Sequence, residues 1–150
     1  MLREDLQNAL KDAMKSKNMP EVNAIRMIIA GMKEKDVDAR GKGKKQADDS
    51  ELLAMMQGMI KQRNESIKLY NDGHRPELAE KEQAEIVIIE RFLPKQLSEA
   101  DMTDVIKGVI TQTGAQSIKD MGKVMGALRG AYAGQMDFGK ASEVIKQLLA

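Results

Sequence analysis

The sequence lacks the residues on which many catalytic and metal sites depend: its 150 residues include no cysteine, no tryptophan and one histidine. Without cysteine there is no thiol nucleophile, no disulfide and no cysteine-ligated zinc or iron–sulfur cluster. The one histidine, His74, lies in a polar run before Pro76 that is typical of a turn, and a single imidazole cannot build a multi-histidine metal site. We therefore expect no catalytic residue, no metal ligand and no cofactor.

The sequence also lacks a strong net charge and a long apolar run. Its 24 basic and 23 acidic residues leave a formal charge of +1, which by itself does not predict nucleic-acid binding. No stretch approaches the roughly 20 apolar residues of a membrane-spanning helix. Charged residues at positions 3–5 also stand where a signal peptide has its apolar core. We expect a cytoplasmic protein with no membrane contact.

Apolar residues recur every three or four positions along most of the chain, which is the period of an amphipathic α-helix. In the first 93 residues this period predicts four helices, at about 1–16, 20–39, 49–71 and 76–93. The run Ile86–Ile89 is also compatible with a strand. Helix is favoured there because strong helix formers precede the run and no second β-rich run exists to pair with it.

Four smaller predictions concern these helices and their connections. The segment Arg40–Lys45 combines two glycines with four cations, so we expect a mobile loop. A residue at positive φ within 71–73 is expected to end the third helix. The acidic residues of the fourth helix are expected to form its solvated face: Glu80, Glu82, Glu85 and Glu90. Methionines on the apolar stripes are expected to fill the core: Met14, Met32, Met56, Met59 and Met125.

A boundary between two helical units is predicted near Pro94. The proline disfavours a helical residue before it, and Ser98 begins an S-x-x-D cap for the next helix. Three further helices follow, the first ended by Gly114, the second by Gly134, and the third capped by Asp137 or Ser142. The predicted fold class is all-α, with an N-terminal bundle of about four helices (1–93) and a C-terminal three-helix domain (94–150).

Four glycines at a spacing of four, Gly122, Gly126, Gly130 and Gly134, mark the second helix of this C-terminal domain. Each interior glycine costs about 0.5–1 kcal/mol relative to alanine, so a compensating contact is expected. A four-residue repeat leaves a groove without side chains that another backbone can approach closely. The simplest explanation is packing against the last helix. The functional one is docking of a partner protein or of an RNA sugar-phosphate chain.

Cations accompany these glycines. Lys123 and Arg129 flank the groove, and further lysines lie nearby in the sequence. Phosphate contacts need this combination of close approach and positive charge. The residues predicted to bind RNA or a protein partner are Lys119, Gly122, Lys123, Gly126, Arg129, Gly130, Lys140 and Lys146.

Two segments resemble the YqeY family in the right order and spacing: FLPKQLSE at 92–99 and DMGKVMGAL at 120–128. The turn NDGHRPEL at 71–78 is similar to the family's D-x-G-R-x-[DE]-L turn, and the resemblance covers essentially the whole chain. The last third also resembles the tail domain of the GatB component of the glutamine-dependent aspartyl/glutamyl-tRNA amidotransferase. One departure is QMDFG at 135–139, where the family commonly has an Ala-Asp-Gly turn.

The resemblance implies an all-α protein with a C-terminal GatB/YqeY-type domain. In the amidotransferase that domain holds the tRNA, while the amide-forming chemistry lies in other domains and subunits. A non-catalytic tRNA-binding or tRNA-metabolism accessory protein is therefore implied, with tRNA as its partner. Two alternatives stay open. One is a protein-interaction adaptor that docks a partner helix on the glycine groove, and the other is a carbon–nitrogen ligase with glutamine as amido donor, a label such proteins often carry by homology.

Overall fold

The computed structural model describes residues 1–150 and contains seven α-helices, one short 3₁₀-helix and no strand. The all-α fold class is therefore confirmed, and Ile86–Ile89 is helical. The chain divides into two compact units, Met1–Pro94 and Lys95–Ala150. None of the helices combines the length and the apolarity that a membrane span requires.

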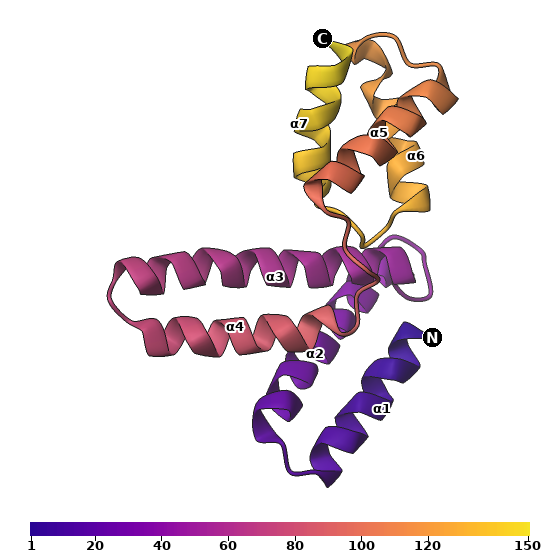
Figure 1. Ribbon diagram of the computed structural model, residues 1–150. Helices are drawn as coiled ribbons and strands as arrows, with labels where there is room; N and C mark the ends of the chain where they lie inside the picture. The colour runs from indigo at the N-terminus through magenta and orange to yellow at the C-terminus, as the bar shows by residue number, and fades with distance from the viewer. The chain divides into compact units, whose positions relative to one another are not determined.

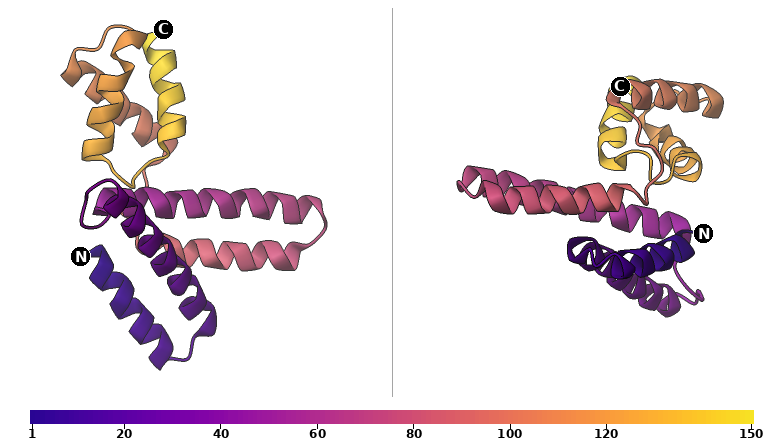
Figure 2. Two further views of the ribbon diagram at one scale, coloured as in Figure 1. Left: turned by 180° about the vertical axis from the view of Figure 1, so that it is seen from behind. Right: turned by 60° about the horizontal axis from the view of Figure 1, so that its bottom comes forward.

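The first unit consists of two antiparallel helical hairpins (Figure 1). They are formed by α1 (Leu2–Lys15) with α2 (Met19–Gly41) and by α3 (Asp49–Asp72) with α4 (Pro76–Glu90). Figures 1 and 2 show α2 crossing the second hairpin beside the N-terminal half of α3. The distal end of that hairpin extends past α1 and α2. Most of its residues are exposed or half-buried, and Ala79 is buried.

Short polar residues begin two of these helices by accepting backbone hydrogen bonds. Asn18 accepts from the N–H of Glu21 at 3.3 Å, and Asp48 accepts from the N–H of Glu51 at 2.8 Å. Each of these caps satisfies one of the backbone N–H groups that a helix start leaves without a partner inside the helix.

The prediction that a residue within 71–73 takes a positive φ is wrong. Gly73 has a φ of −86°, and His74 takes the left-handed conformation instead, with a φ of 58°. Histidine is among the residues that enter this region more often than most. His74 therefore acts as the turn residue between α3 and Pro76, the first residue of α4.

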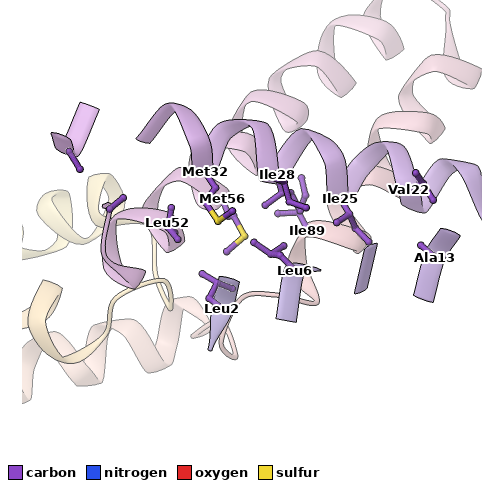
Figure 3. Close-up of a cluster of buried hydrophobic side chains, with 13 residues drawn as sticks. Leu2, Leu6, Ala13, Val22, Ile25, Ile28, Met32, Leu52, Met56 and Ile89 are labelled. Carbon is purple, nitrogen blue, oxygen red and sulfur yellow. The ribbon is translucent and has the colours of Figure 1, made fainter. Parts of the chain in front are cut away.

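One apolar core joins all four helices of the first unit. Figure 3 shows Leu6 from α1, Ile25 and Ile28 from α2, Met56 from α3 and Ile89 from α4 converging on one another. These five side chains are at most 1% exposed. Burying a side chain of this size contributes about 1.5–3 kcal/mol, so these five residues together make a large contribution to the unit's stability.

Met14 and the basic loop differ from expectation. Met14 is 52% exposed rather than buried, because it lies about 100° around α1 from the buried Ala13 and so leaves the apolar face. Helix α2 continues through Arg40 and Gly41, so the connection to α3 begins only at Lys42. Lys44 in that connection forms an ion pair with Glu51 at 2.6 Å.

A polar cluster ties the start of α1 to α2 and to the α2–α3 connection. Both oxygens of Asp36 accept from the Arg3 guanidinium, at 2.8 and 2.6 Å, and Oδ1 also accepts from the N–H of Ala47 at 2.9 Å. Arg3 in turn donates to the carbonyl of Ala47 at 2.7 Å. The hydrogen bonds from Arg3 lower the pKa of the buried Asp36 carboxyl to about 2.

A second buried cation, Arg63, joins α3 to α4. Its Nε lies 2.9 Å from Glu85 and 3.9 Å from Glu82, and its Nη1 donates to the carbonyl of Met59 at 3.1 Å. Arg63 is 6% exposed, and the two glutamates are half-buried beside it. The prediction that Glu82 and Glu85 belong to a solvated face is therefore wrong, whereas Glu80 and Glu90 are exposed as expected.

The second unit contains α5 (Glu99–Thr113), the 3₁₀-helix η1 (Ile118–Asp120), α6 (Met121–Ala131) and α7 (Phe138–Leu149). Ser98 caps α5 through the N–H of Asp101 at 3.1 Å, as predicted, and Gly114 ends it with a φ of 68°. Buried side chains from each α-helix, together with Met136 from the turn between α6 and α7, form the unit's own core: Met102, Ile106, Val109, Val124, Leu128, Met136, Ala141, Ile145 and Leu149.

Candidate nucleic-acid interface

The predicted glycine groove lies on the side of α6 that faces away from the core. At about 100° per residue, Gly122, Gly126 and Gly130 cover about 80° of the helix surface. Val124 and Leu128, which are fully buried, lie about 180° from the middle of that arc. We call these three glycines the glycine lane. Its position opposite the buried face makes the lane a solvent-facing surface of the second unit.

The lane is open rather than packed. A Cβ atom added to Gly122, Gly126 or Gly130 would meet no heavy atom within 4 Å, leaving aside the two adjacent residues and the backbone of the same helix. Packing of these glycines against the last helix, the simplest explanation from sequence, is therefore wrong. The cost of about 0.5–1 kcal/mol per interior glycine has no compensating contact within the chain.

Gly134 does not belong to the lane, although its spacing of four suggested that it does. Helix α6 ends at Ala131, and Gly134 lies in the following turn with a φ of 77°. Glycine adopts this backbone conformation without the steric cost that other residues meet, so the turn explains Gly134. The residue is also buried and accepts a hydrogen bond from the Gln96 side chain through its carbonyl.

Two exposed cations border the lane, one on each side. Lys123 lies about 20° beyond one edge of the arc and Arg129 about 20° beyond the other. The Arg129 guanidinium is placed over the ring of Phe138, the first residue of α7, at 5.8 Å from the ring centre. This cation–π contact orients Arg129 without neutralising its charge.

The start of the lane is fixed by Asp120. Its carboxylate accepts hydrogen bonds from the backbone N–H groups of Gln116 at 2.9 Å and Ser117 at 3.4 Å, and these bonds lower its pKa. Asp120 is therefore held by its own turn, and its negative charge also attracts Lys123 at the border of the lane. Lys119 is exposed in η1, and Ile118 beside it is 53% exposed.

The structure does not bring all the predicted lysines to one face. On α7, Lys140 and Lys146 lie about 120° apart around the helix, on opposite sides of the buried stripe that contains Ile145. Asp137, one of the two cap residues predicted from the sequence, begins α7 by accepting from the N–H of Gly139 at 2.8 Å. Lys123 and Arg129 are thus the predicted cations that border the lane on α6 itself, and a role of Lys140 and Lys146 in binding stays a prediction.

Sequence reasoning did not identify Phe138 or Ile118 as part of this surface. The Arg129–Phe138 contact joins two helices across a turn, and no spacing rule within one helix predicts it. Ile118 had a detectable signal, because it stands four residues before Gly122 and so continues the same spacing. The arrangement as a whole can accept a close-lying backbone and pair with its negative charges. It contains no nucleophile next to a base.

Comparison with known proteins gives one family and a set of curated relatives. The family described as "Yqey-like protein" matches residues 3–149. The fungal protein "Altered inheritance of mitochondria protein 41, mitochondrial" from Pyrenophora tritici-repentis is 32% identical over 130 residues, which are 83% of this chain and 70% of the relative.

Two further proteins of that description are similar to this chain. The one from Meyerozyma guilliermondii is 35% identical over 113 residues, covering 74% of this chain and 57% of the relative. The one from Saccharomyces cerevisiae strain YJM789 is 30% identical over 129 residues, covering 82% and 68%. The word mitochondrial in these names describes the relatives, and the cytoplasmic location expected for this chain stays a prediction.

Proposed function

This chain belongs to the Yqey-like protein family, and from that premise we propose that its second unit binds the sugar-phosphate backbone of tRNA as a non-catalytic accessory module. The observation that carries the proposal is the open glycine lane between Lys123 and Arg129. An RNA strand needs a surface without side chains for close approach and cations beside it for its phosphates, and this face of α6 offers both.

The choice of tRNA rests on the resemblance of the last third of the chain to the tail domain of the amidotransferase, which holds tRNA. In that enzyme the amide-forming chemistry lies elsewhere. The side chains around the lane are likewise suited to binding and not to amide formation. Lysine and arginine can hold phosphates, but Lys123 and Arg129 have no adjacent nucleophile to activate. The carbon–nitrogen ligase label would then describe the chemistry of the amidotransferase and not a reaction of this chain.

Salt dependence tests the proposal with purified protein and bulk tRNA. The Lys123→Ala/Arg129→Ala variant should lose about 1–3 kcal/mol of binding free energy, because it removes two charge-assisted contacts. The slope of log affinity against log salt concentration should also become shallower, by the amount that corresponds to two lost phosphate contacts. A matched control is Lys95→Ala/Lys107→Ala, which removes the same charge from exposed positions outside α6. Equal losses in the two variants would contradict a specific role for the lane.

The alternative is an adaptor that docks a partner helix on the lane. The exposed Ile118 at the start of the lane favours it, because an apolar side chain at an interface contributes to protein contacts more than to phosphate contacts. Gly126→Leu should block either ligand, since a leucine side chain would fill the lane. Salt dependence then distinguishes the two ligands. As the salt concentration rises, the affinity for tRNA should fall steeply, whereas the affinity for a helix docked through apolar contacts should change little.

A further inference from the structure

A groove of about 670 Å³ lies in the first unit, between the second half of α2 and the first half of α3. Its α3 wall is a single helix face with residues at i, i+3, i+4, i+7, i+8 and i+11. Eleven residues at 1.5 Å rise give this wall a length of about 16 Å, or three helical turns. The six residues of the wall are Glu51, Ala54, Met55, Gly58, Met59 and Gln62.

The floor of the groove is apolar, shallow and adaptable. Gly58, at its centre, has open space within 4 Å of the position a Cβ would take, and Ala54 is small and exposed one turn before it. Met55 and Met59 are half-buried beside them. Methionine side chains adjust to the shape of an incoming apolar surface, so this floor suits a helix that inserts apolar side chains.

The α2 wall carries the unpaired charge of the groove. Lys35 and Lys42 are both exposed, and neither forms an ion pair. Lys35 lies on α2, and Lys42 directly follows the last residue of that helix. Continuing the helical rise and turn over these seven residues places the two lysines about 10 Å apart along the axis and within about 20° of each other around it. Asp38 lies between them on the same wall. Lys44, at the end of the groove, is already paired with Glu51 at 2.6 Å.

We propose that this α2–α3 groove binds an amphipathic helix of a partner protein, whose polar flank places two carboxylates two turns apart against Lys35 and Lys42. The occupant follows from length, floor and charge together. Three turns of wall match a short helix, an apolar floor matches its buried face, and the two free lysines match acidic residues at the same spacing.

RNA fits this groove less well than an acidic helix. A sugar-phosphate chain has no apolar face to cover Met55 and Met59, whereas an amphipathic helix covers them and still presents acidic residues on its flank. The groove is also separate from the glycine lane, because all its residues belong to the first unit. The proposal therefore goes beyond tRNA binding and stands or falls independently of it.

The direct test uses two synthetic peptides, each a helix of about four turns with leucines at i, i+3, i+4 and i+7. One carries glutamates seven residues apart on one flank, and the other carries lysines at the same positions. Fluorescence anisotropy with the full chain should show binding of the glutamate peptide and affinity at least about tenfold lower for the lysine peptide. No binding of the glutamate peptide, or equal binding of both, would overturn the proposal.

Substitutions with matched controls locate the site. Gly58→Leu should abolish binding of the glutamate peptide, because the leucine fills the centre of the groove. Gly108→Leu is the control, since Gly108 is also an exposed helical glycine with open space around it but lies on α5. Both variants should keep the circular dichroism of the wild type, because leucine favours helix more than glycine does. Equal effects of the two substitutions would refute the site.

A second pair of variants tests the charge. Lys35→Ala/Lys42→Ala should weaken the glutamate peptide by about three- to tenfold, the range for losing two partly screened ion pairs. Lys33→Ala/Lys61→Ala removes the same charge at positions outside the groove and should leave binding unchanged. Two further outcomes would overturn the proposal that a partner helix occupies the groove. One is displacement of the bound peptide from the groove by tRNA. The other is a concentration-dependent dimer that Gly58→Leu abolishes, which would make a second copy of this chain the occupant.

Discussion

The substitution Asp36→Asn should reveal how strongly one buried carboxylate holds the first unit together. Asparagine keeps the size of the side chain but removes its charge. It also replaces one acceptor oxygen with an NH₂ donor. That donor faces the Arg3 guanidinium in either orientation, and in the Oδ1 position it faces the N–H of Ala47 as well. Either orientation leaves a donor opposite a donor at a site where both Asp36 and Ala47 are buried. We therefore expect a large loss of stability from a small chemical change.

The magnitude follows from the pKa of Asp36. Its value of about 2, against 3.8 for an ordinary aspartate, means that the folded state favours the charged form. At 1.36 kcal/mol per unit, this difference stabilises the folded protein by about 2 kcal/mol at neutral pH. Because the folded pKa is depressed, the contribution is fully present above about pH 5. It is lost as the pH falls toward 2, with about half remaining at pH 3.

Urea unfolding of wild type and variant at pH 7, 5, 4 and 3 measures this contribution directly. We expect the difference in unfolding free energy to be about 2 kcal/mol or more at pH 7 and to shrink as the pH falls, because the wild-type carboxyl becomes protonated while asparagine cannot change. Asp38→Asn is the matched control, since Asp38 is exposed on the same helix and should change stability by at most about 0.5 kcal/mol.

A pH-independent difference would refute the electrostatic part of this reasoning and leave only the loss of hydrogen-bond geometry. A difference at pH 7 no larger than that of the control would refute the role of the cluster altogether. The additional variant Arg3→Gln separates the partners, because a double-mutant cycle with Asp36→Asn gives the coupling free energy of the pair without the effects of each single change.

Three further results are expected. Arg63→Met should lower the unfolding free energy in urea by about 2–4 kcal/mol, because it leaves Glu82 and Glu85 half-buried without their cation; a loss below about 0.5 kcal/mol would show that these carboxylates are adequately solvated. Gly126→Leu should melt at or slightly above the wild-type temperature, since the leucine meets open space and favours helix by up to about 1 kcal/mol; a drop of several degrees would contradict an open lane. Residues 95–150 expressed alone should show a cooperative helical melt by circular dichroism, because their buried side chains pack among themselves; a gradual melt would mean that they need the first unit.

Local sequence patterns predicted the helices well where the deciding interactions are short in sequence. The apolar period and the caps at Asp48 and Ser98 involve residues three or four positions apart, so the sequence contains both partners of each contact. The helical state of Ile86–Ile89 followed from neighbouring helix formers in the same way. The exact turn geometry at His74 was missed because several adjacent residues tolerate a positive φ, and the approach of α4 selects among them.

Only the tertiary structure decided which polar residues are buried and which glycines are free. Arg3 and Asp36 are 33 positions apart, and Arg63 meets Glu85 across 22, so no helical period could pair them. The sequence by itself determined an all-helical chain and the spacing of the glycines on α6. Whether Gly126 packs internally or faces solvent depends on which side of α6 the other helices cover, and that choice is made by the burial of Val124 and Leu128.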